Sequence, residues 1–261
     1  MNWAVDMNTL VIGGLASARV LSFLSTLPIL GVRTVPSPVR VAIALCFATA
    51  MMPTIRAAGA VAPATPVTLA LALAIEILVG LLLAFAAVTV FATVQFAGEM
   101  IGVQMGLALA NVVDPTSNMQ ISTMSQVFNL IAVLIFLAVD GPVNLLRAFA
   151  QGYEAMPPGA FVPTPESMFA AIAQVGTLFS LAVRIALPVI TALMLVSLTL
   201  GVLGRTVPQM NLLVVGFPIK ILVGIFVVAV SVPLFGETIA GTLRELPDRL
   251  GDIIWAGPVG R

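Results

Sequence analysis

The sequence predicts an all-α membrane protein, and three observations support this class. Hydrophobic residues make up 60% of the 261 positions, whereas charged residues make up only 8%. Soluble domains carry about 25% charged residues, so a water-soluble fold could not cover its surface with so few. The apolar residues are gathered in long blocks. In lipid, a single apolar block satisfies all its backbone donors only as a helix.

Six apolar blocks follow one another and are separated by segments rich in Pro or Gly. They run over residues 10–30, 41–55, 67–97, 127–139, 168–200 and 212–235. Pro36 and Pro38 separate the first two blocks, Pro53 closes the second, and Pro63 and Pro66 precede the third. We interpret the chain as one domain over residues 1–261, in which 236–261 form a more polar C-terminal tail.

The block lengths are too uneven for six simple spans. A span needs about 20 residues. Block 168–200 is much longer, block 67–97 continues through a glycine-rich stretch to Ala110, and block 127–139 is too short. We expect bent or broken long helices, with a kink at Pro188, or helices that lie partly outside the lipid. Basic residues are distributed too evenly to predict an orientation.

A ladder of small residues interrupts the bulky apolar sequence at every fourth position. It consists of Gly98, Gly102, Gly106 and Ala110, and Glu99 lies within it. A face of this kind lets another helix backbone approach closely, and a polar residue there can form a hydrogen bond across the contact. Two alternatives remain open. The ladder packs either against another helix of the same chain or against a neighbouring subunit.

Four further charges lie inside the apolar blocks, at Arg19, Glu76, Arg184 and Lys220. A charge at the centre of a bilayer costs about 2.5 kcal/mol or more. Arg19 and Lys220 are close enough to block ends for their head groups to reach the lipid–water interface. For Glu76 and Arg184 we favour burial in an ion pair or beside a wet cavity.

The loop that follows the ladder is polar but nearly uncharged. Its central residues are Asn111, Val112, Val113, Asp114, Pro115, Thr116, Ser117 and Asn118. Asp-Pro followed by Thr-Ser-Asn favours a turn and then a capped helix start. The loop is either a simple connector or a segment that fills a channel containing water.

A helix-breaking turn is predicted between the fifth and sixth blocks. Pro208, Gly216 and Pro218 carry this prediction.

Several chemistries have no support in the sequence. The chain has no His, its one cysteine is Cys46, and its formal net charge is zero. The usual general base and thiolate metal sites are therefore excluded, and no basic patch points to nucleic acid. We expect no enzyme activity, no cofactor and no metal.

Four stretches together resemble the FliR family, the membrane subunit of the flagellar export gate, which is related to the SctT family of injectisomes. They are Pro28-Ile29-Leu30-Gly31, the segment Gly98-Glu99 to Gln104-Met105-Gly106, Asp114-Pro115, and Pro208-Gln209-Met210-Asn211 leading to Gly216-Phe217-Pro218. Length and block order match over nearly the whole chain.

The resemblance implies a structural and gating subunit in the bacterial inner membrane, at the flagellar basal body. Such a subunit joins FliP and FliQ in a helical hetero-oligomer that passes unfolded flagellar proteins, and FlhB packs against it. The ladder would then pack against other subunits, and residues 111–118 would plug the closed pore. The alternatives are an injectisome homologue, or a stand-alone multi-pass transporter that uses Glu76, Glu99 and Arg184.

Overall fold

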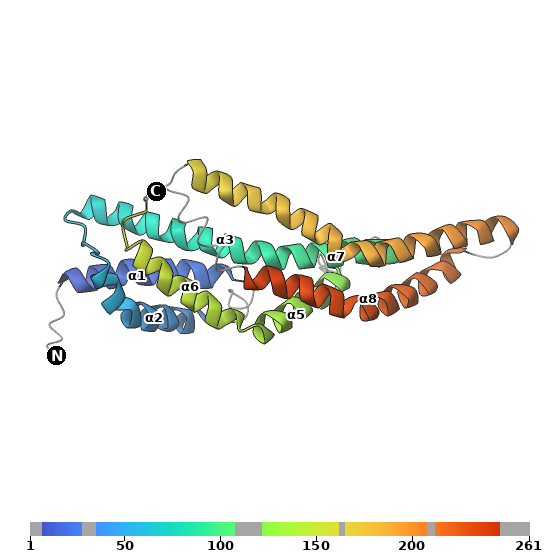
Figure 1. The fold of residues 1–261 in the computed structure, drawn as a ribbon, viewed down its shortest axis with the longest axis horizontal. Coiled ribbons are helices and arrows are strands. Elements are labelled where there is room, and N and C mark those ends of the chain that lie inside the picture. The colour runs from blue at the N-terminus through green and yellow to red at the C-terminus, as the bar shows by residue number, and fades with distance from the viewer. Residues whose placement is uncertain (1–6, 28–34, 108–121, 162–164, 208–211, 246–261) are drawn as a thin grey trace. The chain divides into compact units, whose positions relative to one another are not determined.

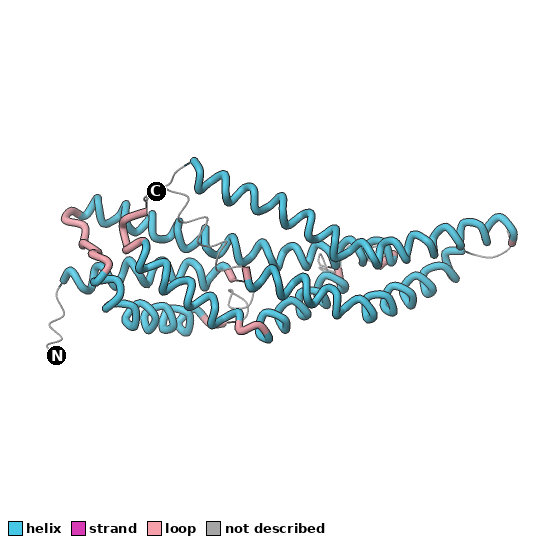
Figure 2. The backbone as a smooth tube through the Cα atoms, viewed as in Figure 1, coloured by secondary structure: helices cyan, strands magenta, loops and turns pink. Residues whose placement is uncertain are grey.

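The computed structural model describes residues 7–27, 35–107, 122–161, 165–207 and 212–245, and every regular element in these ranges is a helix (Figures 1 and 2). The helices are α1 (Met7–Thr26), α2 (Ser37–Ala57), α3 (Pro66–Met105), α5 (Thr123–Ala138), α6 (Gly141–Ala155), α7 (Pro165–Thr206) and α8 (Leu212–Arg244). The all-α prediction is confirmed.

Prolines mark helix starts more reliably than helix ends in this chain. Pro66 is the first residue of α3, and the Thr65 hydroxyl accepts the backbone N–H of Thr68 at 3.2 Å, which caps the helix. The expectation that Pro53 closes the second block is wrong, because α2 continues through it to Ala57. A proline removes one backbone hydrogen bond, which the rest of an apolar helix can tolerate.

The short fourth block is one half of a broken helix pair. It extends at its N-terminal end to form α5, and after Val139 and Asp140 the chain continues as α6. Asp140 has a φ of 55°, in the left-handed region that few residues other than glycine adopt. Its carbonyl accepts the N–H of Asn144 at 3.0 Å, which begins α6. The sequence did not predict α6 because polar residues interrupt its linear apolar run, although Leu145, Phe149 and Tyr153 form one continuous buried face of the helix.

The chain divides into two compact units. The first contains Met1–Thr89, Asp140–Val175 and Arg244–Arg261, and the second contains Val90–Val139 and Gly176–Leu243. Helix α3 therefore contributes its first part to one unit and its second part to the other.

In the first unit, one face of α1 forms the centre of the core. Its buried residues are Ile12, Leu15, Ala16, Arg19, Val20, Phe23 and Leu24, spaced as one face of a helix. The Phe23 and Phe149 rings lie 4.5 Å apart between centroids, which joins α1 to α6. Phe47 of α2 meets Phe149 edge-on at 6.2 Å.

In the second unit, aromatic pairs join α3, α5 and α8. The ring centroids of Phe91 and Phe136 are 5.5 Å apart, and those of Phe128 and Phe235 are 5.8 Å apart. All four side chains are buried. Such pairs contribute roughly 0.5–1.5 kcal/mol each beyond the apolar area they bury.

Five helices of the described residues are long and apolar enough to cross a membrane. They are Met7–Thr26, Ser37–Ala57, Pro66–Met105, Val175–Thr206 and Val214–Arg244, and the broken pair α5–α6 makes a sixth if it counts as one span. The 40 residues of α3 are about twice the number that one perpendicular span needs.

Candidate functional site

The glycine ladder forms the inner face of a hairpin between α3 and α5. Gly98 is buried, and a Cβ added there would lie 2.9 Å from the Met124 carbonyl oxygen and from the Ser125 Cα. One turn later, a Cβ on Gly102 would lie 2.5 Å from the Ser122 hydroxyl. Only glycine leaves room for the two backbones at this separation.

A polar network crosses the same hairpin beside the glycines. The buried Ser125 hydroxyl lies 2.9 Å from Glu99 Oε2 and 3.0 Å from the Gln95 carbonyl oxygen. Because a hydroxyl donates only one proton, the carboxylate, as the stronger acceptor, takes it best. One turn away, the Gln95 amide donates to the Asn129 amide oxygen at 2.7 Å. The network fixes the register of α5 on α3.

Gly106 ends α3 in a conformation that a side chain would strain. Its φ is +85°, and a Cβ there would lie 2.5 Å from the Phe217 ring of α8. Its N–H donates to the Val103 carbonyl, and the N–H of Leu107 donates to the Gly102 carbonyl, both at 3.0 Å. This is the pattern of a glycine that terminates a helix.

All of these contacts lie within the chain, and packing of the ladder against other subunits stays a prediction. At Gly98 and Gly102 the space is filled by α5 of the same chain, and at Gly106 it is filled by Phe217. The physical reason is the tight hairpin, which needs small residues on α3 for its own closure. Glu99 likewise has its partner, Ser125, within the chain. Ala110 lies outside the described residues.

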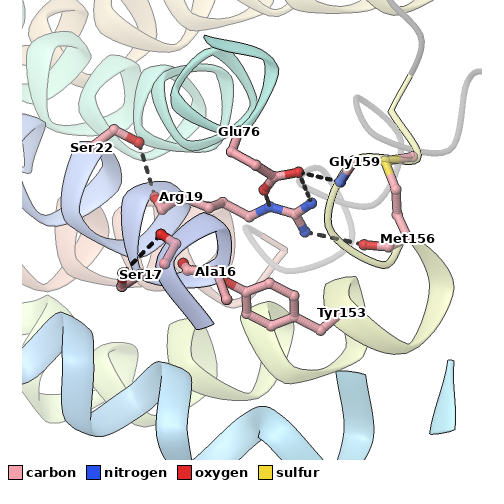
Figure 3. Close-up of polar contacts among 9 residues, drawn as sticks. Ala16, Ser17, Arg19, Ser22, Glu76, Tyr153, Met156 and Gly159 are labelled. Carbon is pink, nitrogen blue, oxygen red and sulfur yellow. Dashed lines mark hydrogen bonds and ion pairs between the residues drawn. The ribbon is translucent and has the colours of Figure 1, made fainter. Parts of the chain in front are cut away.

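A second cluster, in the first unit, is built on a buried ion pair between Arg19 of α1 and Glu76 of α3 (Figure 3). Arg19 Nε donates to Glu76 Oε2 at 2.5 Å, and Arg19 Nη2 donates to Glu76 Oε1 at 3.0 Å. The side chains are 2% and 0% exposed. This two-point geometry is the strongest form of pairing between a guanidinium and a carboxylate.

The segment after α6 completes the hydrogen bonding of this pair. The N–H of Gly159 donates to Glu76 Oε1 at 2.8 Å, and Arg19 Nη1 donates to the Met156 carbonyl at 3.2 Å (Figure 3). The centroid of the Tyr153 ring lies 4.7 Å from the Arg19 guanidinium carbon. The Tyr153 hydroxyl donates to the Ala16 carbonyl at 2.8 Å. We call these residues the α1–α3 clasp.

The clasp also brings α1 and α3 unusually close together. At Gly80, one turn after Glu76, an added Cβ would overlap the Ser22 hydroxyl and the Arg19 carbonyl. The buried charges are thus paired and hydrogen-bonded, which offsets the cost of removing them from water. Such a group holds elements together rather than reacting.

No group of three or more potential metal-ligating side chains occurs among the described residues. The network at Glu99 and the clasp share one property. Each connects helices that are distant in sequence through hydrogen bonds inside an apolar environment.

Comparison with known proteins identifies the family. Residues 10–246 match the family described as bacterial export proteins, family 1. The flagellar biosynthetic protein FliR of Escherichia coli (strain K12) is 36% identical over 242 residues, which cover 90% of each chain. The chain belongs to the FliR family.

Other relatives agree with this assignment. The FliR of Bacillus subtilis (strain 168) is 33% identical over 223 residues, covering 81% of this chain and 82% of that protein. The surface presentation of antigens protein SpaR of Shigella flexneri is 34% identical over 153 residues, 59% of each chain. The FliR resemblance drawn from the sequence is confirmed, and with its apolar helices this FliR-family chain is a membrane protein.

The structure places the remaining predicted residues of this FliR-family chain apart from the two clusters. Arg184 of α7 is exposed on this chain, which differs from its predicted burial, and Lys220 of α8 is half-buried. Gly216 and Pro218 lie within α8, so the helix-breaking turn does not extend to them. Pro208 and residues 111–118 lie outside the described residues.

Sequence reasoning missed several partners in the two clusters. It named Glu76 and Arg19 without pairing them, and it omitted Tyr153, Gly159 and Ser125. A signal for Tyr153 exists, because it is the only tyrosine in the chain and lies next to the Pro-rich segment. For Gly159 the signal is Pro-Pro-Gly, a sequence typical of a turn. No local sequence pattern indicates a role for Ser125.

Proposed function

We propose that this FliR-family chain is a structural and gating subunit of the flagellar type III protein export gate. In this proposal it assembles with FliP and FliQ in the bacterial inner membrane at the flagellar basal body, contacts FlhB, and passes unfolded flagellar proteins. The observation that carries the proposal is the 36% identity to a flagellar FliR over 90% of both chains.

The packing of the second unit supports a role in assembly. Its hairpin is closed from within by glycines and a buried polar network, so the α3–α5 pair has a fixed shape. At the same time α7 and α8 expose large apolar side chains, among them Phe179, Leu198 and Phe226 at 58%, 68% and 69% exposure. Faces of this kind are covered by lipid or by other subunits.

The stand-alone transporter alternative loses support from the same contacts. It required Glu76, Glu99 and Arg184 as transport residues. Glu76 is instead held by Arg19 and Gly159 in a buried clasp, and Arg184 is exposed. The injectisome alternative rests on the SpaR match, which covers 59% of the chain, whereas two FliR matches cover 81% and 90%.

Co-purification and complementation test the proposed function together. The tagged chain, expressed from its native locus, should co-purify with FliP-like and FliQ-like subunits in stable stoichiometry. Deletion of its gene should abolish flagellar export and motility, and plasmid-borne expression should restore both. Purification of an active, single-species transporter with no such partners would refute the proposal.

The plug at residues 111–118 is tested separately. Cells that make the complete gate with this segment deleted should leak small solutes and ions, because the closed pore would lose its filling. A matched deletion within the tail after residue 245 controls for loss of assembly. Unchanged leakage in a gate that still assembles would eliminate the plug while leaving the export function intact.

A further inference from the structure

Arg40 of α2 is buried without a counter-ion among the residues the structure describes. Arg40 is only 5% exposed, and its Nε has no hydrogen-bond partner in the described part of the chain. Within the same residues, its Nη2 donates one long hydrogen bond, to the Ser37 hydroxyl at 3.3 Å. Removing a guanidinium from water without an anion costs several kcal/mol. At Arg19, which is 2% exposed, this cost is offset by a two-point ion pair with the Glu76 carboxylate.

The position of Arg40 directs it at the N-terminus of α2. Ser37 is the first residue of this 21-residue helix, and its hydroxyl is the group that the guanidinium contacts. Helix N-termini carry the positive end of the helix dipole. In α2, Pro38 has no N–H and the Val39 N–H donates to the Pro36 carbonyl at 3.1 Å, so the attraction for an anion comes from the dipole and the Ser37 hydroxyl. The N-cap residue, Pro36, has no side-chain hydrogen bond to the helix. The helix start and Arg40 thus combine two attractions for an anion at one point.

An apolar groove runs along the same helix from its first turn. It has a volume of about 580 Å³ and is bordered by α6. Six of its lining residues are Pro38, Val39, Ala42, Ile43, Cys46 and Leu146. Val39 and Ile43 are 46% and 40% exposed, so the groove is open along its length. All of these residues, and Arg40, belong to the first unit.

We propose that the N-terminal end of α2 binds an anionic phospholipid, with the phosphate at Arg40 and Ser37 and an acyl chain in the groove. The two halves of the site match the two halves of one ligand. The buried cation at the helix N-terminus would pair with the phosphate, and the uncharged groove beside it would hold the hydrocarbon chain. A soluble anion would leave the groove empty, and a neutral lipid would leave Arg40 unpaired.

The test uses the full chain in nanodiscs of phosphatidylcholine, with or without phosphatidylglycerol. Native mass spectrometry of the released protein counts retained lipids. A charge-assisted hydrogen bond contributes about 1.5–3 kcal/mol, so the wild type should retain phosphatidylglycerol over phosphatidylcholine by roughly tenfold or more. Arg40→Gln should lose this preference, and Arg40→Lys should keep part of it. Arg56→Gln, at the exposed arginine in the last turn of the same helix, is the matched control and should behave as wild type.

The single cysteine offers a second readout that does not depend on lipid release. Cys46 is exposed and lines the groove, so a bound acyl chain should slow its reaction with a maleimide. Phosphatidylglycerol should protect Cys46 in the wild type and in Arg56→Gln, but not in Arg40→Gln. Ala42→Trp fills the groove and should weaken lipid retention although Arg40 is present.

Four results of the lipid experiments would overturn the proposal. They are equal retention of both lipids by the wild type, an unchanged preference in Arg40→Gln, full retention in Ala42→Trp, and competition by inorganic phosphate at concentrations matching the lipid. The last result would mean that a free anion suffices. A protein carboxylate cross-linked to this end of α2 in the assembled gate, with no lipid present, would also overturn it. Thermal unfolding of each variant controls for misfolding.

Discussion

Arg19 and Glu76 meet in a two-point ion pair across 57 positions of sequence, with Arg19 Nε 2.5 Å from Glu76 Oε2. Both side chains are buried, and the pair also binds the backbone of Met156 and Gly159. One interaction therefore connects α1, α3 and the segment after α6. Apolar contacts have no direction, so this pair, together with the hydrogen bond from Tyr153 to Ala16, fixes which faces of the helices meet.

Breaking the pair on one side should strongly destabilise the first unit. Glu76→Gln leaves a buried guanidinium without its anion, and removal of one partner of a buried pair costs about 3–5 kcal/mol. Arg19→Lys should also destabilise, because an ammonium cannot form the two-point contact. We expect a lower thermal unfolding temperature in detergent for both. Glu154→Gln, at an exposed carboxylate of α6, should have little effect, and equal losses in Glu76→Gln and Glu154→Gln would contradict the role of the pair.

Gly98→Ala should separate α5 from α3. The added Cβ would meet backbone atoms of Met124 and Ser125 at 2.9 Å, and backbone cannot move aside as a flexible side chain can. Overpacking of this kind costs about 1–3 kcal/mol. Disulfide or spin-label distances across the hairpin would report the separation. Gly201→Ala, where nothing lies within 4 Å, is the control and should be neutral or stabilising by up to about 1 kcal/mol. A hairpin that tolerates Gly98→Ala equally well would refute the close approach.

Gly106→Ala should suffer from two separate effects, backbone strain and a clash with Phe217. Gly59 has a similar φ of +78° with open space around it, so Gly59→Ala measures the strain alone. We expect Gly106→Ala to be the more destabilising of the two in denaturant unfolding. Combining Gly106→Ala with Phe217→Leu should recover the clash component but not the strain component. If the Phe217 change gives no recovery, the ring is not the obstacle.

Ser125→Ala should weaken the hairpin by leaving a Glu99 oxygen without its donor. The loss of one partner of a part-buried hydrogen bond to a charged group costs about 1–3 kcal/mol. Adding Glu99→Leu to Ser125→Ala should restore part of the stability, since apolar replacement of both partners is nearly neutral. A double-mutant cycle on unfolding free energies measures the coupling. Ser180→Ala, at an exposed serine of α7, is the control, and additive effects of the Ser125 and Glu99 changes would mean that the two side chains do not interact.

The helical class and the apolar segments follow from the sequence because they depend on composition and on local chain geometry. Few charges and long apolar blocks exclude a soluble fold, and lipid leaves helices as the structure for such blocks. The same local reasoning erred at Pro53 and Pro218. A proline removes one hydrogen bond, but whether the helix ends there depends on the packing around it.

The family assignment was also accessible from the sequence, because motifs such as Gly98-Glu99 and Gly216-Phe217-Pro218 are read directly from the order of residues. The residues that these motifs contact could not be read from the sequence. The ladder indicated a close helix contact without naming the helix, and in the structure Gly98 and Gly102 face α5 and its preceding residue, whereas Gly106 faces α8 of the same chain.

What the tertiary structure alone decided is the pairing of distant polar groups. The sequence showed that Arg19, Glu76 and Arg184 were costly in an apolar environment. It could not show that Arg19 is paired with Glu76, that Arg184 is exposed, or that Arg40 is buried at a helix start without an anion among the described residues. Burial and charge pairing are properties of positions in space. In this chain those positions are set by how glycine-lined helices close on one another, which no local pattern specifies.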